Sequence, residues 1–343
     1  MANTECGVCN RKNSKLLYKA PSFDPPLGND PAEFELYQCS HCMVAQIHPI
    51  PTPDALTKYY SPTYYGTAKA KFNPLIELIT RIENKIRASK MLRFMPHHVP
   101  NETRVLDIGC GRGNFIKTLA KEGYQCTGVE LSSFPEPPAP AQPGQPQFLT
   151  GEIESLPLAP GSFDGISIWH VFEHVRKPSH TLKRCHELLK PGGTLMIAVP
   201  HFKSFQSRIF RKNWFHLDLP RHLYHFQKGA LLSLLSQHGF EILSVDTQGW
   251  DQNIFGFIQS AFNSLLFWRP FNEWFQILKK QDPKRGAPGG APAKARNRLS
   301  GLLRYLAYLS ASALLLPLAL IENVFSVALS RGGSLVVIAR KKD

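Results

Sequence analysis

The sequence predicts an α/β fold in which helices cover both faces of a mostly parallel sheet. Residues 105–108 have the apolar pattern of a buried strand, and residues 115–120 have the spacing of an amphipathic helix. Between them lies the glycine turn Asp107-x-Gly109-x-Gly111-x-Gly113. Glycine permits open backbone conformations and lets a ligand approach without meeting a Cβ, so this arrangement indicates a nucleotide cradle. A tight turn in any α/β sheet can share the pattern, so the turn alone leaves both interpretations open.

A second strand, residues 125–129, follows this helix and ends at Glu130, 17 positions after Gly113. A carboxylate at the end of the second strand is placed to bind a ribose diol. Later blocks at 151–178, 188–200 and 332–341 follow in order. Together these features resemble the class I S-adenosylmethionine-dependent methyltransferases, and the glycine spacing differs from the G-x-G-x-x-G of dinucleotide dehydrogenases.

That resemblance implies a Rossmann-like, seven-stranded, mostly parallel sheet in which strands 6 and 7 form an antiparallel pair. It also implies an S-adenosylmethionine site, where Glu130 would hold the ribose, Glu152 would accept from the adenine amino group and Ile153 would pack against the ring. The full set of cofactor-binding residues assigned in this way is Asp107, Gly109, Cys110, Gly111, Gly113, Glu130, Leu131, Glu152, Ile153 and Trp169.

Composition limits the partners and the compartment. The 343 residues suffice for one large α/β domain and an accessory module. With 40 Lys and Arg against 26 Asp and Glu, the net charge is +14, which indicates an anionic partner such as nucleic acid, a phosphorylated substrate or an acidic membrane surface. Seven cysteines, an odd number, and an N-terminus without a signal-peptide pattern argue against a secreted disulfide scaffold, so we expect a cytoplasmic protein.

Two cysteine knuckles stand near the start of the chain. Cys6-x-x-Cys9 and Cys39-x-x-Cys42 supply four thiolates at paired spacing, which suits a tetrahedral zinc ion. We therefore predict a zinc-ribbon-like module over residues 1–60, with reduced cysteines that hold no metal as the alternative. A site closed by four thiolates has no open coordination position, so we assign it a structural role only.

Residues 61–100 are predicted to form a helical linker or cap. Tyr59, Tyr60, Tyr64 and Tyr65 precede it, in a segment similar to one that folds over the methionine end of the cofactor in a bacterial methyltransferase subfamily. Simple packing of these rings against the main domain is the alternative. Asn73 and Pro74 are then expected to start a helix whose apolar residues face the core. These apolar residues are Leu75, Ile76, Ile79, Ile82 and Ile86. This orientation would leave four basic residues in solvent: Arg81, Lys85, Arg87 and Lys90.

A proline-rich segment at residues 134–147 replaces the helix expected between strands 2 and 3, because proline at this density cannot continue a helix. Such a loop would leave one wall of the adenosine site more open. An insertion without a role is the alternative.

Strand 4, residues 164–169, runs into His170-Val-Phe-Glu173-His174. The N/D-P-P-Y/F motif of amino-directed nucleic-acid methyltransferases is absent from this place, which disfavours methylation of a base. Glu173-His174 matches the E-H pair of small-molecule and ubiquinone-type O-methyltransferases, some of which use a divalent cation nearby. At helical spacing His170, Glu173 and His174 could ligate such a cation. We prefer the alternative, in which Glu173 and His174 anchor the helix and His170 alone faces the pocket.

Residues 214–226 follow the fifth strand, whose carboxyl end is where open α/β sheets bind ligands. The predicted substrate-binding residues in this segment are His216, Arg221, His222 and Tyr224. A structural turn whose charges satisfy one another is the alternative. The candidates for a general base are His170, His201 and His225, in that order.

The methyltransferase domain, residues 101–249 and 332–343, is interrupted by an insertion at 250–331. Two apolar stretches, 254–268 and 305–321, flank a basic linker, and both are at or below the length that crosses a bilayer. A seventh strand that returns to the sheet requires an even number of crossings or none. We therefore predict two helices in the membrane interface, with a soluble lid or a dimer interface as the alternative. The residues expected at headgroup level are Trp268, Trp274, Lys279, Lys280, Lys284, Arg285, Arg296, Arg298 and Arg304.

The sequence thus predicts a methyltransferase that acts on a hydroxyl, amine or carbon of a small-molecule, glycan-precursor or lipid-linked acceptor. We expect it to be peripheral or monotopic on the inner face of the plasma membrane, with anionic lipid as a partner. Two rival classes are a zinc-ribbon RNA-binding methyltransferase and a non-catalytic, membrane-tethered cofactor-binding module. The basic residues gather around the apolar stretches, which argues against nucleic acid, and the intact glycine turn with Glu130 argues against a degenerate cofactor site.

Overall fold

The structure, a computed structural model, describes residues 2–23, 33–60, 74–95, 98–131, 145–266, 270–278 and 298–342. Several predictions fall outside these ranges. They concern Tyr64, Tyr65, the N-cap Asn73, most of the proline-rich segment, Trp268 and the basic linker with Lys279, Lys280, Lys284, Arg285 and Arg296.

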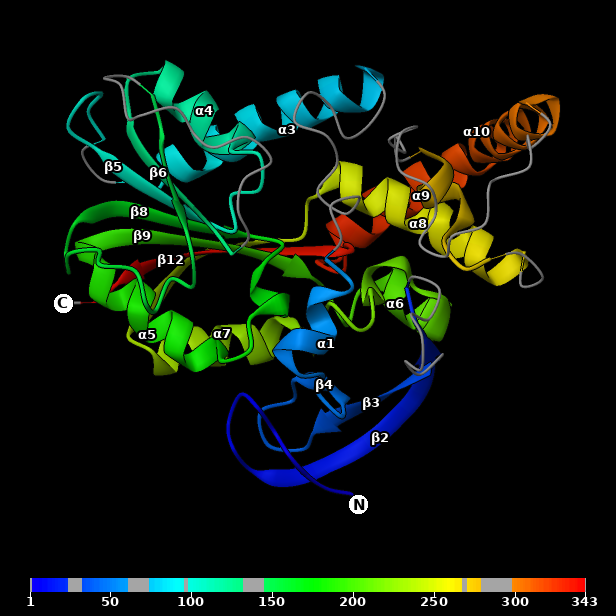
Figure 1. The fold of residues 1–343 in the computed structure, drawn as a ribbon, viewed down its shortest axis with the longest axis horizontal. Helices are drawn as coiled ribbons and strands as arrows, with labels where there is room; N and C mark the ends of the chain where they lie inside the picture. The colour runs from blue at the N-terminus through cyan, green and yellow to red at the C-terminus, as the bar shows by residue number, and fades with distance from the viewer. Residues whose placement is uncertain are drawn as a thin grey trace.

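A seven-stranded sheet forms the centre of the molecule, in the order β11-β12-β9-β8-β5-β6-β7 (Figure 1). The pairs among β5 to β9 are parallel, whereas β12 runs antiparallel to both β9 and β11. This topology confirms the predicted fold class. The strands are β5 Arg104–Ile108, β6 Gln125–Glu130, β7 Gln147–Thr150, β8 Phe163–Trp169, β9 Leu189–Pro200, β11 Phe240–Asp246 and β12 Ser334–Lys341.

Helices cover both faces of this sheet. Figure 1 shows α3 Pro74–Leu92 and α4 Asn114–Lys121 on one face, and α5 Pro178–Leu188 and α7 Lys228–Gln237 on the other. In α4 the apolar residues recur at helical spacing and are all buried, as the sequence predicted. Short helical segments connect the sheet to the rest of the chain: η1 Phe172–His174, α6 Phe205–Phe210, η2 Arg211–Asn213 and η3 Phe215–Leu217.

The predicted orientation of α3 is wrong. Ile82 and Ile86, expected in the core, are 44% and 46% exposed, whereas Arg87, expected in solvent, is buried together with Ala88 and Met91. Close packing of α3 against strand β8 explains why Arg87, Ala88 and Met91 are buried. A Cβ on Gly165 of β8 would come within 2.5 Å of the Met91 side chain, so the sheet accepts α3 on its Ala88–Met91 side.

A second, antiparallel sheet is built from the N-terminal residues. It contains β1 Ala2–Glu5, β2 Lys12–Pro21, β3 Glu33–Cys39 and β4 Ala45–His48, followed by the short helix α1 Pro53–Thr57. Its fifth strand, β10 Tyr224–His225, comes from the segment between β9 and α7 of the methyltransferase domain and pairs with β4. Buried residues of both sheets form one continuous apolar cluster, so the N-terminal module shares its core with the main domain.

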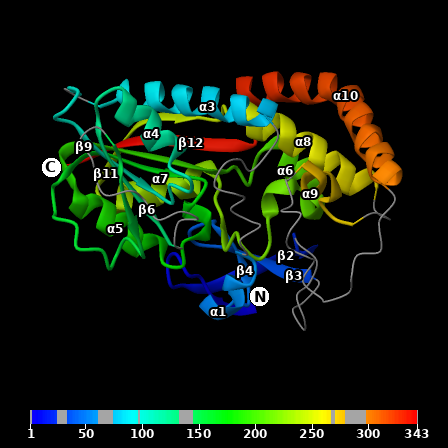
Figure 2. The same cartoon turned by 45° about the horizontal axis from the view of Figure 1, so that its top comes forward.

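The described residues of the insertion form three helices, α8 Trp250–Leu265, α9 Glu273–Leu278 and α10 Arg298–Ala328. The second apolar stretch is longer than predicted, because α10 continues through Pro317 for 31 residues. Figure 2 shows that this helix changes direction along its length, as expected where proline removes a backbone hydrogen bond. Strand β12 follows and returns to the sheet, as the topological argument required.

Candidate active site

The glycine turn lies between β5 and α4, at the carboxyl edge of the sheet. Gly111 has a φ of 54°, and a Cβ built on it would meet no atom within 4 Å. Gly113 is the N-cap of α4, with a φ of 71° and no side-chain oxygen to cap the first N–H groups of the helix. The turn therefore leaves open space beside a helix N-terminus, which fits the cofactor expected there.

Asp107 lies buried beneath this turn and forms an ion pair with Arg87 of α3. The same guanidinium also donates to Ser167 Oγ on β8, and it lies 3.8 Å from the centre of the Phe115 ring. Burial raises the pKa of Asp107, and the positive charge of Arg87 opposes that shift. The ion pair thus fixes α3 to the cradle. Sequence analysis missed this role of Arg87, although a buried acid in the turn signals that a cation is needed.

Two further residues that were predicted to bind the cofactor lie near this ion pair. Trp169, the last residue of β8, lies with its ring centre 4.9 Å from the Arg87 guanidinium. Cys110 is buried behind the turn, where a Cβ on Gly128 would come within 2.7 Å of its sulfur. Burial raises the pKa of the Cys110 thiol, so this residue packs as a neutral side chain.

Glu130 ends β6 beside the glycine turn. Its Oε2 accepts a hydrogen bond from the Gly111 N–H at 2.9 Å, and its Oε1 accepts one from the Leu131 N–H at 2.9 Å. Burial raises the pKa of Glu130, and these backbone donors act in the opposite direction. Glu152 is exposed after β7, whereas Ile153 is buried in the core. The carboxylate of Glu130 is therefore held at the place expected for a ribose diol.

His170 follows β8 in the left-handed region, with a φ of 51°. Its Nε2 lies 3.2 Å from Ser334 Oγ, and its Nδ1 lies 3.5 Å from Glu173 Oε1. Glu173 and His174 belong to the 3-10 turn η1, so the three residues do not share one face of an α-helix. His170 is half-buried at the carboxyl edge of the sheet, and Glu173 is buried below it.

His201 and His225 are both buried. His201 Nδ1 lies 3.2 Å from the Gly332 carbonyl oxygen. Burial lowers the pKa of His201 to about 4 and that of His225 to about 3, which makes both rings weak bases near neutral pH. Neither ring is therefore suited to act as the general base.

The four predicted substrate residues are buried in a packed turn. Arg221 forms an ion pair with Asp218 at 2.5 Å, and Tyr224 donates to the Arg176 carbonyl oxygen at 3.1 Å. Ring nitrogens of the two histidines lie near backbone oxygens: His216 Nε2 is 3.1 Å from that of Gln252, and His222 Nδ1 is 2.9 Å from that of His216. This geometry matches a turn that satisfies its own polar groups more closely than an open substrate surface.

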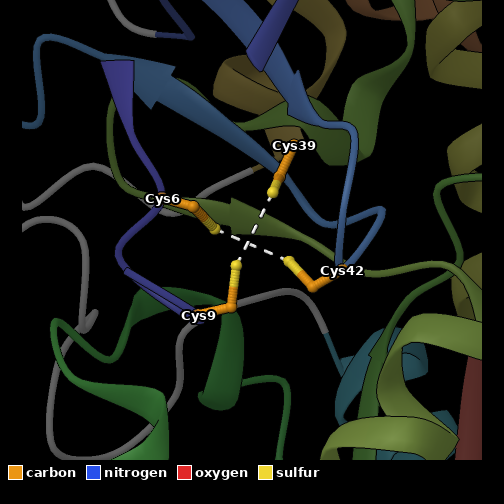
Figure 3. Close-up of side chains that lie close together, drawn as sticks. All are labelled: Cys6, Cys9, Cys39 and Cys42. Carbon is orange, nitrogen blue, oxygen red and sulfur yellow. Dashed lines mark hydrogen bonds between the residues drawn. The ribbon is translucent and has the colours of Figure 1, made fainter. Parts of the chain in front are cut away.

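The four cysteines of the knuckles converge between β1, β3 and the turns that follow them (Figure 3). The sulfurs of Cys6 and Cys42 are 3.6 Å apart, as are those of Cys9 and Cys39, and all four lie within 4.8 Å of one another. Four thiolates around a zinc ion at Zn–S distances of about 2.3 Å would be separated by about 3.8 Å. The cysteines are free rather than disulfide-bonded, and their spacing fits a tetrahedral zinc site.

Comparisons with known proteins agree with this geometry. A family model described as a methyltransferase domain matches residues 70–245, slightly more than half of the 343 residues. The ubiquinone biosynthesis O-methyltransferase of Xanthomonas campestris pv. campestris (strain B100) is 36% identical over 102 residues, which cover 28% of this chain and 42% of that protein. A protein of the same name from Albidiferax ferrireducens is 32% identical over 173 residues, which cover 46% of this chain and 69% of that protein. The chain thus spans less than half the length of the Xanthomonas relative it matches.

The solved structures that match this chain include two methyltransferases. An S-adenosylmethionine-dependent methyltransferase from Archaeoglobus fulgidus has a TM-score of 0.44 at 17% identity, over 76% of this chain and 94% of that one. A second one, from Methanosarcina mazei, has a TM-score of 0.40 at 16% identity, over 80% of this chain and 99% of that one. Because the family match covers more than half of the residues and the Albidiferax relative is matched over most of its length, the chain belongs to the class I S-adenosylmethionine-dependent methyltransferases.

Proposed function

We propose that this enzyme transfers a methyl group to a hydroxyl, amine or carbon of a small-molecule, glycan-precursor or lipid-linked acceptor at a membrane surface. The relatives named above act, by name, as O-methyltransferases in ubiquinone biosynthesis, which favours a hydroxyl acceptor. The observation that carries the membrane part of the proposal is the apolar outer face of α10. Strand β12, which follows this helix, begins at Ser334 opposite Pro200, at the carboxyl end of β9.

S-adenosylmethionine supplies an electrophilic methyl group on a sulfonium. The glycine turn, Glu130 and Glu152 would hold it, and alignment of the acceptor with the methyl group would supply most of the catalysis. His170 would accept the proton of a hydroxyl or amine acceptor, because it is half-buried and directly follows β8 at the carboxyl edge of the sheet. His170→Gln is then expected to lower kcat by about a hundredfold or more. An unchanged kcat would remove His170 from this role.

The cradle can be tested with two matched glycine substitutions. Gly111 and Gly161 have φ values of 54° and 60°, and a Cβ on either would meet no atom within 4 Å. Both alanine variants therefore carry a similar backbone strain of about 1–2 kcal/mol, but Gly111→Ala also fills the space beside the helix N-terminus. In calorimetric titration with S-adenosylmethionine we expect affinity to fall by at least about tenfold for Gly111→Ala, or 1.4 kcal/mol. Gly161→Ala should bind like the wild type, and equal affinities in both variants would contradict this placement.

The outer face of α10 is strongly apolar. Gly301–Ala328 is the one helical stretch in the described ranges that is long and apolar enough to cross a membrane, and 11% of its most apolar window is buried. The side chain of Leu314 is 80% exposed. Exposed apolar residues occur along the whole helix, at Leu302, Leu303, Leu306, Leu309, Leu314, Leu316, Leu318, Leu320, Ile321, Val324 and Phe325. A surface of this size indicates an interaction site.

The inner face of α10 is bound to the domain near both ends. Close to its N-terminus, Tyr308 donates to Glu273 of α9 at 2.6 Å and stacks on Trp274. Close to its C-terminus, Glu322 accepts from Gln206 at 3.0 Å, and Asn323 accepts from Asn253 at 2.9 Å. A single crossing of a bilayer would break one of these sets. We therefore propose that α10 lies along the membrane interface.

Helix α3 extends this surface. Leu78, Ile82 and Ile86 are exposed at i, i+4 and i+8, and Arg81 and Lys85 are exposed between them. Apolar residues flanked by basic ones are typical of helices that bind anionic membranes. Figure 2 shows α3 and α10 along the same side of the molecule, with the N-terminal sheet on the opposite side. Both helices could therefore face one lipid surface.

Flotation with anionic liposomes tests this orientation. We expect the wild-type protein to float at low salt and less so at high salt. Leu314→Glu removes an apolar contact of about 1.5–3 kcal/mol, so the bound fraction should fall by roughly tenfold. Leu16→Glu alters a leucine that is 42% exposed on β2, on the opposite side, and should float like the wild type. No association at low salt, with full solubility in the absence of detergent, would rule out the membrane proposal.

A further inference from the structure

Asn253 of α8 is a buried amide at the place where helix α10 leads into strand β12. The residue is 0% exposed. Its Oδ1 accepts a hydrogen bond from the Ser334 N–H at 3.0 Å, and its Nδ2 donates to Asn323 Oδ1 at 2.9 Å and to the Thr247 carbonyl oxygen at 3.3 Å. An amide has one acceptor oxygen and two donor hydrogens, so this side chain uses all its polar groups and is held in one orientation.

Two glycines let the chain pass close to this amide. A Cβ on Gly333 would come within 3.0 Å of Asn253 Oδ1, and a Cβ on Gly332 would come within 3.0 Å of its Nδ2 and within 2.2 Å of the Thr247 carbonyl oxygen. Residues without a Cβ are needed where two segments approach this closely. The glycine pair therefore brings Ser334, the next residue, within reach of Asn253.

Ser334 connects this amide to His170. Ser334 is 1% exposed, and its Oγ lies 3.2 Å from His170 Nε2. On the other side of the ring, His170 Nδ1 lies 3.5 Å from Glu173 Oε1. An ionised carboxylate only accepts, so Nδ1 carries the ring proton and Nε2 keeps the lone pair that a general base needs. The Ser334 hydroxyl then donates to this lone pair, and its position determines how the ring is oriented.

The other end of the connection lies on helix α10. Asn323 is on the inner face of this helix, and Phe325, two residues later, is 61% exposed on the outer face. Gln206 joins the same elements a second time, because its Nε2 donates to the Asn253 carbonyl oxygen at 2.7 Å and to Glu322 Oε2 at 3.0 Å. A displacement of the last turns of α10 therefore acts directly on Asn253.

We propose that Asn253 is a positioning residue for methyl transfer, which links helix α10 to His170 through Ser334. This inference rests on the proposed function, in which His170 takes the proton of the acceptor and the outer face of α10 contacts lipid. The link makes the orientation of the base depend on the position of α10. Contact of this helix with a membrane and proton transfer at the edge of the sheet are thereby coupled.

The chain offers a matched control for Asn253 on the same helix. Asn263 is 8% exposed, and its Nδ2 donates to Asn272 Oδ1 at 2.8 Å and to the Asn213 carbonyl oxygen at 3.2 Å. Its Oδ1 accepts from the Asn272 N–H at 3.0 Å. Asn263→Ala thus removes the same kinds of hydrogen bond as Asn253→Ala, at a place with no connection to His170 among these bonds.

The rate of label transfer from S-adenosylmethionine to membrane extract, at saturating cofactor, is the first measurement. We expect the rate of Asn253→Ala to fall by between about tenfold and a hundredfold, because a displaced base no longer meets the acceptor. Asn263→Ala should keep the wild-type rate. Calorimetric titration should show the same cofactor affinity in the wild type and both variants, since neither asparagine belongs to the glycine turn.

A second pair of variants breaks the link on α10. Asn323 is half-buried, so Asn323→Leu endangers the fold less than a change at Asn253 does. It removes the oxygen that accepts from Asn253 and should also lower the rate. Asn323→Asp keeps an acceptor oxygen at this place and should restore the rate of the wild type.

The nitrogen resonances of the His170 ring provide a readout that needs no acceptor. In full-length protein with ¹⁵N-labelled histidine, the His170 signals are identified by their loss in His170→Gln. We expect them to shift in Asn253→Ala and Asn323→Leu, and to stay in place in Asn263→Ala. Unchanged signals in Asn253→Ala, or an equal loss of rate in Asn263→Ala, would overturn this inference alone. A wild-type rate in His170→Gln would instead contradict the proposed base.

Discussion

Replacing Arg87 by leucine is expected to lower the free energy of unfolding by about 3–5 kcal/mol. The substitution leaves Asp107 as a buried carboxylate without its cation, and it also removes the bond to Ser167. Because the same ion pair fixes α3 beneath the glycine turn, the variant should also bind S-adenosylmethionine more weakly. Denaturant-induced unfolding and calorimetric titration measure the two effects.

Lys85→Leu is the matched control for this substitution. Lys85 lies on the same helix, but its side chain is exposed, and such surface changes usually alter stability by less than about 0.5 kcal/mol. The double variant Arg87→Leu/Asp107→Leu should recover part of the lost stability, because neither charge is then buried alone. If Arg87→Leu unfolds at the same denaturant concentration as Lys85→Leu, the buried ion pair does not stabilise the fold.

Loss of the proposed zinc ion is expected to have the second large effect. Structural zinc contributes about 10–16 kcal/mol of binding energy in small modules, more than the stability of most domains. Cys6 and Cys39 are buried in the apolar cluster that continues into the main domain, and β10 completes the N-terminal sheet. We therefore expect Cys39→Ser to lower the Tm of the whole chain by more than about 10 °C, equivalent to about 3–5 kcal/mol for a domain of this size.

Sensitivity to a chelator distinguishes zinc from simple packing of the thiols. A strong zinc chelator should lower the Tm of the wild type but leave that of Cys39→Ser unchanged. Cys126→Ala is the control, since Cys126 is buried but stands outside the four-cysteine cluster, and it should keep its sensitivity to the chelator. A wild-type Tm that the chelator does not change would indicate cysteines without a metal.

The strands of the central sheet could be predicted because each one carries its own signal. Residues 105–108 are mostly apolar and are followed by Gly109, and residues 195–199 form an apolar run followed by Pro200. Such a pattern is sufficient to predict a buried strand. The position of Glu130 could be predicted because the second strand pairs with the first, so that its end lies beside the glycine turn. These features depend on neighbours in the chain.

The features that sequence reasoning missed depend on contacts between distant segments. The period of α3 marks an apolar stripe at Ile82 and Ile86, but it does not say whether the sheet or another surface covers that stripe. The pairing of Tyr224 with Gln46 is a two-residue strand without a local pattern. Likewise, the sequence around His216 shows a dense group of polar residues, but it does not show whether they bind substrate or backbone oxygens. In the structure His216 lies next to a backbone oxygen. Pro317 lies inside α10, and the helix bends and continues past it.

The most direct test of the proposed function follows a labelled methyl group from S-adenosylmethionine into separated membrane and soluble extracts. With the wild-type enzyme we predict that the label enters a small molecule of the membrane extract. Gly161→Ala should behave in the same way, and Gly111→Ala should transfer at least about tenfold less when the cofactor is limiting. Label that appears only in the soluble extract, or in nucleic acid, would contradict a membrane-surface acceptor.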